Sequence, residues 1–296
     1  MTTTTSLEQA QTLLNTLMEQ ARVGAIIPVR LPAQLEEIAL LLNEAKKQAD
    51  QPPPPPPGGE GFDPDALKKE QAGFFGHAVH ELRTPMTSIR GYSDMMANPA
   101  MGALTDMQKQ FVDVIRTNGK RMETLLQDVS DMNKLRAGTL RTTLKMDMFK
   151  NIAMMIEKNM RPLAEQLNRT LTLDIPSGLP ILNTDGELLA KAISKLVENA
   201  LRYTKDGGQV TVRASAQGNE LTIQVEDNGI GMTEAEMQQL GTVYFRSENE
   251  YVRTYKGSGL GIPVAYGIVK ALGGSISVTS AVDQGTTFTI KLQGMT

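Results

Sequence analysis

Six consecutive prolines, Pro52 to Pro57, set the strongest limit on how this chain can fold. Each proline lacks the backbone N–H that a helix or sheet uses, and in a helix its ring collides with the preceding turn, so the run favours extended polyproline II. Glycines at 58, 59 and 61 then add a flexible joint. We therefore predict a linker at 51–62, in preference to an SH3-type ligand, with separate folded parts on either side.

Composition limits the possible functions. The chain has 296 residues, 40% of them hydrophobic, which is enough for about two domains with cores. A net charge of -3 provides no basic surface, so a nucleic-acid partner is not expected. The absence of cysteine excludes disulfides and suits a cytoplasmic protein. No apolar run reaches the roughly 18 to 20 residues of a membrane span, so we expect a cytoplasmic protein without one.

The segment 1–50 is predicted to form two short amphipathic helices, at 6–22 and 33–49, with an extended connector between them. Each apolar stripe is too narrow for a monomeric core, so the pair is expected to dimerise. The layout weakly resembles a HAMP signal-relay module, and a plain helical dimerisation hairpin is the alternative. The prolines that follow count against HAMP, because such modules continue into the next domain as helix.

Two longer stretches between residues 63 and 138 carry the seven-residue seam of helices that pack in bundles. Along the first seam, steps of four and three alternate at Phe75, Val79, Leu82, Met86, Ile89, Ser93 and Met96. The second seam repeats the spacing at Phe111, Ile115, Asn118, Met122, Leu125, Val129 and Met132. Both seams are narrow, so the antiparallel hairpin needs a second hairpin to bury them, and a homodimeric four-helix bundle is expected.

Capping residues predict where these helices begin and end. Asp63 can cap a helix that starts at the following proline and runs to about Ala97. Pro85 is expected to kink this helix, because it removes one backbone hydrogen bond. Thr105 and Gln108 form a capping-box pattern at the start of the second helix.

His80 lies just beside the first seam and is followed by Glu81. An imidazole at the edge of a bundle keeps one nitrogen exposed as a nucleophile, while the neighbouring carboxylate can accept a proton from the other. The segment 80–85, His-Glu-Leu-Arg-Thr-Pro, resembles the H-box of bacterial sensor histidine kinases, in which the histidine carries the phosphoryl group. The resemblance implies catalytic roles for His80, Glu81 and Thr84, with Thr84 orienting a water during dephosphorylation of a partner. Alternatively, the Thr84 hydroxyl bonds to the helix carbonyl of His80.

From about residue 139 the pattern changes to strands interleaved with helices, which predicts an α/β sandwich over 139–296. Strands are expected at 140–146, 170–175, 209–214, 221–226, 275–279 and 286–292. Helices are expected at 149–167, 186–203, 233–239 and 262–272.

Four motifs rich in asparagine or glycine occur in a fixed order in this domain, at 196–204, 227–232, 257–261 and 285–288. They resemble the N-box and the successive glycine boxes of the ATP-binding fold shared by gyrase, heat-shock chaperones and histidine kinases, the GHKL fold. With the H-box, the resemblance covers residues 63–296. It implies that the protein uses ATP and Mg²⁺.

The first motif contains three candidate ligands. The amide oxygen of Asn199 suits Mg²⁺, Arg202 lies on the same helical face for phosphate oxygens, and Tyr203 can pack alongside. Lys195 departs from the family pattern, because relatives have glutamate or asparagine four residues before the box asparagine. A protonated lysine cannot activate water and its charge opposes a nearby Mg²⁺, so an ATPase motor of the gyrase type is disfavoured.

The other motifs supply candidate contacts to adenine and phosphate. Asp227 can accept a hydrogen bond from the adenine amine, and glycine allows the backbone to approach the base. A helix that opens directly after 257–261 offers free N–H groups and the positive end of its dipole to phosphates. The nucleotide-binding residues expected from these motifs are Asp227, Gly229, Gly231, Gly257, Gly259, Leu260, Gly261 and Thr287.

The polar segment 241–256 is predicted to be a lid over the nucleotide. Phe245 and Arg246 resemble the F-box of the family, and Arg246 or Lys256 is a candidate contact to the terminal phosphate. The alternative is that both are solvated loop charges.

Together these features imply a cytoplasmic, homodimeric histidine kinase. MgATP would phosphorylate His80, and the phosphoryl group would pass to an aspartate on the receiver domain of a separate response regulator, with phosphatase activity toward that regulator also expected. The alternative is a catalytically weak nucleotide-binding signalling scaffold, with Lys195 as the sign of lost catalysis.

Overall fold

The computed structural model describes residues 12–13, 16 and 64–295. The chain divides into two compact units, Met1–Asp65 and Ala66–Thr296, and nearly everything described belongs to the second. The linker at 51–62, the Asp63 cap and most of the two helices expected in 1–50 lie outside the described residues. No helix in the described ranges is both long and apolar enough to span a membrane.

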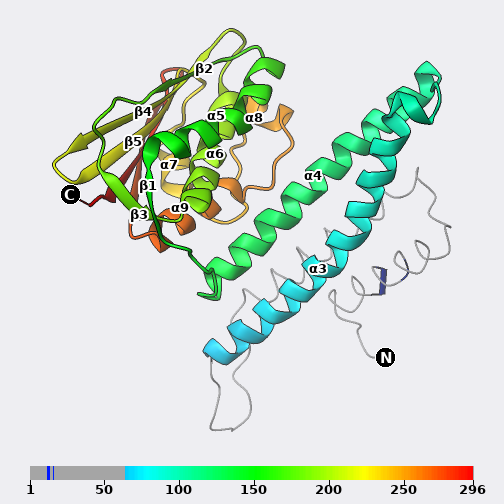
Figure 1. The fold of residues 1–296 in the computed structure, drawn as a ribbon, viewed down its shortest axis with the longest axis horizontal. Helices are drawn as coiled ribbons and strands as arrows, with labels where there is room; N and C mark the ends of the chain where they lie inside the picture. Colours follow the sequence, from blue (N-terminus) through cyan, green and yellow to red (C-terminus); the bar gives the residue numbers. More distant parts are fainter. Residues whose placement is uncertain (1–11, 14–15, 17–63, 296) are drawn as a thin grey trace. The chain divides into compact units, whose positions relative to one another are not determined.

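Two long helices form the N-terminal part of the second unit. Helix α3 runs Pro64–Ala97 and α4 runs Asp106–Arg136, with the short 3-10 helix η1, Pro99–Met101, between them (Figure 1). The expected capping box starts α4: the Thr105 hydroxyl accepts from the Gln108 N–H, and the Gln108 side chain accepts from the Thr105 N–H. Helix α3 continues through Pro85 to the predicted end.

Few side chains are buried between α3 and α4. Met86 is buried and its terminal methyl lies 3.9 Å from the position that a Cβ on Gly119 would take. Toward the loop end, two ion pairs of 2.7 Å join the helices, Arg90 with Glu123 and Arg116 with Asp94. The start of the second seam is open to solvent in the single chain, since Phe111 is 60% and Ile115 is 36% exposed.

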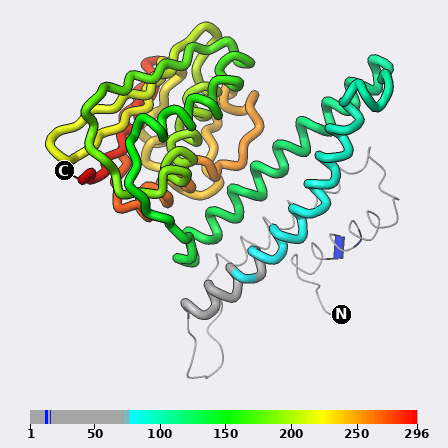
Figure 2. Tube along the Cα trace, viewed as in Figure 1, coloured from blue at the N-terminus to red at the C-terminus, as the bar shows by residue number. Residues whose placement is uncertain are grey.

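A five-stranded mixed sheet forms the base of the C-terminal domain, in the order β2-β4-β5-β7-β6. Strand β2 is parallel to β4 and the other neighbours are antiparallel. The bounds are β2 Thr170–Asp174, β4 Gln209–Gln217, β5 Glu220–Asp227, β6 Ser275–Ala281 and β7 Gly285–Gln293. Separately, β1 Lys145–Met148 pairs antiparallel with β3 Ile181–Thr184. Figure 2 shows the end of the chain after β7 returning toward β3, where the Met295 N–H donates to the Ile181 carbonyl over 2.7 Å.

Helices cover one face of this sheet, which gives a two-layer sandwich (Figure 1). They are α5 Phe149–Gln166, α6 Gly186–Tyr203 and α9 Gly261–Ala271. The short helices α7 Glu234–Gln239 and α8 Glu250–Thr254 lie between β5 and α9 in the chain. The largest fully buried side chains come from both layers: Phe149, Ile152, Ile156, Leu182, Leu189, Ile193, Leu196, Leu201, Leu221, Ile223, Leu260 and Ile268. The predicted helical and α/β fold class is confirmed.

The strand expected at 140–146 is wrong over most of its length, since β1 begins only at Lys145. Asp185 explains the difference. One oxygen of its carboxylate accepts from the Thr143 N–H over 2.9 Å, and the other caps α6 by accepting from the Leu188 N–H over 3.0 Å. The backbone before β1 is thus held by a side chain. Neither β3 nor α8 was expected from the sequence.

Candidate functional site

A pocket of about 1000 Å³ lies where α6, α9, the ends of β5 and β7, and the segment 241–259 meet, with residues of α4 along one side. Most of the expected nucleotide-binding residues line it: Asn199, Arg202, Tyr203, Asp227, Gly231, Arg246, Gly257, Gly259 and Gly261. The fold therefore brings together motifs that are up to about ninety residues apart in the chain.

Asp227 lies at the end of β5, where alternate residues point into the core. Leu221, Ile223 and Val225 precede it on the buried face, and Asp227 itself is only 9% exposed. Burial raises the pKa of this carboxyl to about 6, while hydrogen bonds from the backbone of Gly229 and Thr286 oppose the rise. The Asp227 carboxylate is thus a hydrogen-bond acceptor in apolar surroundings, and an acceptor of this kind can recognise an amine.

Gly229 does not line the pocket but shapes its floor. A Cβ at this position would lie 2.5 Å from the carbonyl oxygen of Tyr203, and the same oxygen accepts from the Ile230 N–H over 3.1 Å. At Gly231 the backbone is left-handed, with φ of 62°, and a Cβ would overlap the Ala281 carbonyl oxygen. Both glycines are therefore needed for the loop after β5 to close against α6 and β6.

Thr287 was expected at the site, but Thr286 is the residue that lines it. Side chains alternate along a strand, so adjacent residues of β7 face opposite ways. Phe288, two residues on, shares the pocket face, and the Thr286 hydroxyl lies 2.9 Å from that of Ser280. Leu260 is also outside the pocket, because its side chain is buried in the core at the start of α9.

Arg202 is held by its own helix and by the lid. Its Nε and Nη2 donate to Glu198 over 3.1 and 2.8 Å, and its guanidinium lies 5.9 Å from the ring centre of Tyr255. The Tyr255 ring also meets Tyr203 edge-on, with 6.2 Å between centres. Tyr255 and Glu198 were not expected at the site. Tyr255 links α6 to the lid, and Glu198 holds the Arg202 side chain on α6.

Arg246 is not a solvated loop charge, and its contact with the terminal phosphate stays a prediction. Its guanidinium is half-buried and donates to the carbonyls of Val252, Tyr255 and Gly257. These three carbonyls belong to the turn around α8, so Arg246 organises the lid from within. Lys256 lines the same pocket and is exposed.

The segment 257–261 brings the first turn of α9 against α6. Gly259 has φ of 69°, and a Cβ there would lie 2.7 Å from the backbone of Tyr244. A Cβ on Gly261 would lie 3.8 Å from Cδ of Lys195 and 3.9 Å from Nδ2 of Asn199. The free N–H groups at the start of α9 therefore face the same space as Asn199, which suits phosphate binding.

Asn199 can hold a divalent cation, but with little help from other side chains. No group of three or more His, Cys, Asp or Glu residues in the described part of the chain could hold a metal. Glu198, the nearest carboxylate in sequence, is engaged by Arg202. Magnesium bound with nucleotides keeps several waters and uses one or two side chains plus phosphates, so a single amide oxygen fits this role.

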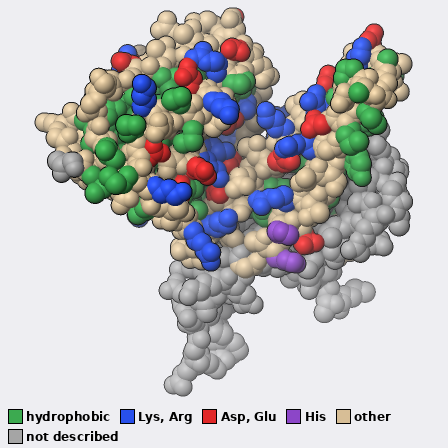
Figure 3. All heavy atoms as spheres, viewed as in Figure 1, with side chains coloured by type: hydrophobic (Ala, Val, Ile, Leu, Met, Phe, Trp, Pro, Cys, Tyr) green, Lys and Arg blue, Asp and Glu red, His purple; other side chains and the backbone are tan. Residues whose placement is uncertain are grey.

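The H-box residues lie on α3. The side chain of His80 is 74% exposed, and its Nδ1 lies 3.8 Å from Oε1 of Glu81. Buried Val79 and Met86 fix the helix face, so the imidazole points away from the hairpin core. Both histidines of the chain, purple in Figure 3, lie at the surface.

Thr84 is exposed on the same helix. Within the described ranges its hydroxyl makes no hydrogen bond to the His80 carbonyl, so the structural alternative for this residue finds no support. The hydroxyls that bond back to the helix belong to Thr87, with the Arg83 carbonyl, Ser88, with the Thr84 carbonyl, and Ser93, with the Arg90 carbonyl.

Two segments of the chain match known protein families. Residues 70–138 match the His Kinase A (phospho-acceptor) domain. Residues 184–295 match the family described as histidine kinase-, DNA gyrase B-, and HSP90-like ATPase. The first segment contains His80, and the second contains every nucleotide-binding residue expected from the sequence.

Curated proteins with similar sequences include histidine kinases. An uncharacterized sensor-like histidine kinase of Rhizobium meliloti is 31% identical over 220 residues, which cover 74% of this chain and 42% of that protein. The histidine protein kinase DivJ of Caulobacter vibrioides is 32% identical over 233 residues, 78% of this chain and 38% of that protein. The chain thus spans less than half the length of these relatives.

Among solved structures, full-length ShkA in complex with AMPPNP aligns with a TM-score of 0.64 and 24% identity, over 77% of this chain and 46% of that one. At this identity the match concerns the fold, a helical hairpin followed by a mixed sheet under helices.

Proposed function

We propose that this chain, which belongs to the sensor histidine kinases, transfers the γ-phosphoryl group of ATP to His80 and then to an aspartate on a separate response regulator. The observation that carries the proposal is the pairing of two features in one chain. One is the exposed imidazole of His80 beside the Glu81 carboxylate, and the other is the pocket around Asn199 and Asp227.

The exposed imidazole supplies the nucleophile. The lone pair of Nε2 attacks the γ-phosphorus, the bond to the bridging oxygen breaks, and ADP leaves with those electrons. The proton on Nδ1 passes to Glu81, whose oxygen is 3.8 Å away in the free protein and needs only a side-chain rotation to reach it. This assignment leaves Nε2 open to a nucleotide brought from outside the helix.

The pocket supplies position and charge. Asp227 would accept from the adenine amine, and the start of α9 would receive the phosphates with its N–H groups. Asn199 would hold Mg²⁺, which neutralises phosphate charge when bound. Arg246 would keep the turn of the lid folded, since it donates to the carbonyl of Val252, and Tyr255 would hold the lid against Arg202 of α6.

A homodimer would complete the hairpin. Large apolar side chains near its loop end are exposed in the single chain, namely Tyr92, Met95, Met96, Met101, Met107, Phe111, Val114 and Ile115. Burying such a face in water is favourable by about 25 cal/mol per Å². A second copy packed on this face would make the four-helix bundle predicted from the seams. The cytoplasmic location remains a prediction.

Incubation with labelled ATP and Mg²⁺ tests the kinase proposal. We expect the wild type to gain label that is lost in acid and kept in base, as expected of phosphohistidine, and His80→Ala to gain none. His77→Ala is the matched control, since His77 is exposed one turn earlier on the same helix. Label on His80→Ala, or none on the wild type, would overturn the proposal.

A nucleotide-binding scaffold is the second candidate, and Lys195 is the observation that favours it. The stem of Lys195 lies near Asn199, because both face Gly261, although its ammonium pairs with Asp128. Relatives carry a residue without positive charge at this position, so Lys195 weakens the case for efficient metal-assisted transfer. ATP binding with no phosphohistidine, in either Mg²⁺ or Mn²⁺, would select the scaffold.

A further inference from the structure

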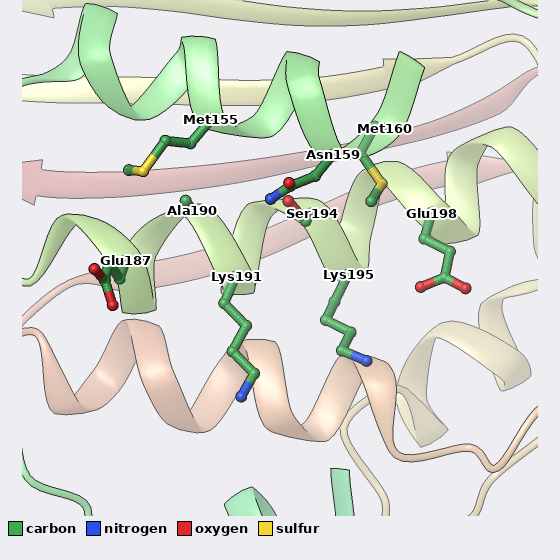
Figure 4. Close-up of a pocket in the computed structure, with 9 residues that line it drawn as sticks. All are labelled: Met155, Asn159, Met160, Glu187, Ala190, Lys191, Ser194, Lys195 and Glu198. Carbon is green, nitrogen blue, oxygen red and sulfur yellow. The ribbon is translucent and has the colours of Figure 1, made fainter. Parts of the chain in front are cut away.

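Two ion pairs join α4 to α6. Nζ of Lys195 lies 2.6 Å from Oδ1 of Asp128, and Lys191 pairs with Asp131 one turn away. The two carboxylates are each 5% exposed, and Lys195 is 13% exposed. Figure 4 shows both lysine side chains leaving α6 in the same direction, away from the α5 residues Met155 and Asn159.

The two pairs differ in what else they touch. Asp128 and Lys195 line the nucleotide pocket, whereas Asp131 and Lys191 do not. Both lysines line the smaller groove of about 300 Å³ between α5 and α6 that Figure 4 shows. The stem of Lys195 also lies against the first turn of α9, at Gly261, next to the amide of Asn199. Its ammonium therefore lies within one side-chain rotation of the place where phosphates are expected.

Asp128 depends on this ammonium. Its Oδ1 accepts no hydrogen bond from other groups in the described part of the chain, so Lys195 is the counter-ion of that oxygen. A buried carboxylate is costly without such a partner. A nucleotide phosphate would attract the same ammonium, so Asp128 and a bound nucleotide compete for one cation.

We propose that Lys195 is a phosphate-binding residue and that its ion pair with Asp128 keeps its ammonium away from the phosphates. While α4 packs against α6, Asp128 withholds the ammonium from the nucleotide. When α4 moves away, the ammonium turns to the phosphates and supplies a fixed positive charge beside Asn199. This inference rests on the proposed function, because it assumes that the pocket binds ATP.

Reciprocity follows from this competition. If packing of α4 weakens nucleotide binding, then nucleotide must weaken the packing of α4 by the same factor. The state of the hairpin would thus be coupled to the occupancy of the pocket through one side chain.

Equilibrium binding of ATP, measured by calorimetry with EDTA and again with Mg²⁺, tests the inference. We expect Asp128→Asn to lower the Kd for ATP by about fivefold, since an amide does not hold the lysine. Asp131→Asn is the matched control: it breaks an equally buried pair at the same contact and should leave the Kd within about twofold. Lys195→Met should bind ATP more weakly than wild type, and adding Asp128→Asn to it should restore nothing.

Other outcomes separate the possibilities. Equal tightening by Asp128→Asn and Asp131→Asn, or tightening that persists in Lys195→Met, would overturn the inference in favour of a general effect of docking. An unchanged Kd in Asp128→Asn would overturn it too and leave the kinase proposal standing. Failure of the wild type to bind ATP would instead overturn the proposed function.

Hydrogen exchange keeps the inference testable if Asp128→Asn does not fold. Saturating ATP should speed exchange of the backbone N–H groups at 125–132 in the wild type. The same addition should leave exchange unchanged in Lys195→Met. Equal exchange in the wild type with and without bound ATP would contradict the coupling.

Discussion

The carboxylate of Asp227 accepts a hydrogen bond of 2.8 Å from the backbone N–H of Gly229, two residues further along the same turn. The bond fixes one carboxylate oxygen against the loop while burial raises the pKa of the group to about 6. Because this buried acceptor is fixed in place and has a pKa close to neutral pH, its protonation should affect both nucleotide binding and the stability of the fold.

Nucleotide binding should weaken as the pH falls through about 6. The adenine recognition that we propose requires Asp227 as an acceptor, and protonation turns one of its oxygens into a donor. Fluorescence titration with an adenine nucleotide between pH 5 and 8 would show the change. Asp283→Asn is the control, because this exposed carboxylate should leave the pH profile unaltered. A flat profile for the wild type would contradict the role of Asp227.

Stability should respond to Asp227 in the opposite sense from most carboxylates. Its folded pKa lies above the unfolded value of 3.8, so its contribution favours the folded state at low pH and is lost as the pH rises from about 4 to 6. We expect Asp227→Asn to abolish ATP binding yet to raise the free energy of unfolding at pH 7.5 by about 1 to 3 kcal/mol. Urea denaturation of both proteins measures this difference. A loss of stability would show that the charge is better solvated than its burial indicates.

Gly231→Ala should unfold the loop after β5. The added Cβ would overlap the Ala281 carbonyl oxygen, and φ of 62° is strained for alanine, so we expect a loss of about 3 kcal/mol or more. Gly207→Ala isolates the strain, since Gly207 has φ of 71° with no atom within 4 Å of the added Cβ among the described residues. It should cost about 1 kcal/mol. Thermal unfolding of the two variants would refute this account if their costs were equal.

Arg246→Lys should loosen the lid although the charge is kept. An ammonium cannot reach three carbonyls that a planar guanidinium joins, so the turn around α8 should open and the Kd for ATP should rise about tenfold. Limited trypsin digestion would report cleavage in 250–256, followed with and without nucleotide. Arg253→Lys is the matched change on the exposed side of α8 and should resemble wild type. If both variants are digested alike, the lid does not depend on Arg246.

Thr84→Ala should leave labelling of His80 intact while slowing the loss of phosphate from the cognate regulator by about tenfold or more. The hydroxyl is exposed and free of the helix carbonyl of His80, so it is available to orient a water. Thr87→Ala controls for the loss of a hydroxyl on this helix, since Thr87 bonds to the Arg83 carbonyl instead. Equal dephosphorylation rates for Thr84→Ala and wild type would remove the catalytic role.

Local patterns in the sequence predicted much of this fold. The Thr105–Gln108 capping box and the helix expected at 186–203 appear with the same bounds, because hydrogen bonding and apolar spacing within one helix decide both. The strand expected at 140–146 fails for a non-local reason, since Asp185 binds the backbone at Thr143.

The sequence predicted those site residues that belong to short motifs of consecutive residues. Strand alternation would have selected Thr286 in place of Thr287, since Phe288 is the apolar residue that faces the core. Tyr255 and Asp128 carry no signal of their own, because their roles depend on which distant side chain they meet, Arg202 in one case and Lys195 in the other.

Locating the phosphoryl group itself tests the central claim most directly. The full chain, incubated with MgATP and digested at alkaline pH, can be sequenced by mass spectrometry under conditions that preserve phosphohistidine. The account predicts a phosphoryl group on His80 and none on His77, although both are exposed on α3. A phosphoryl group on another residue, or a chain that binds ATP and stays unmodified, would contradict it.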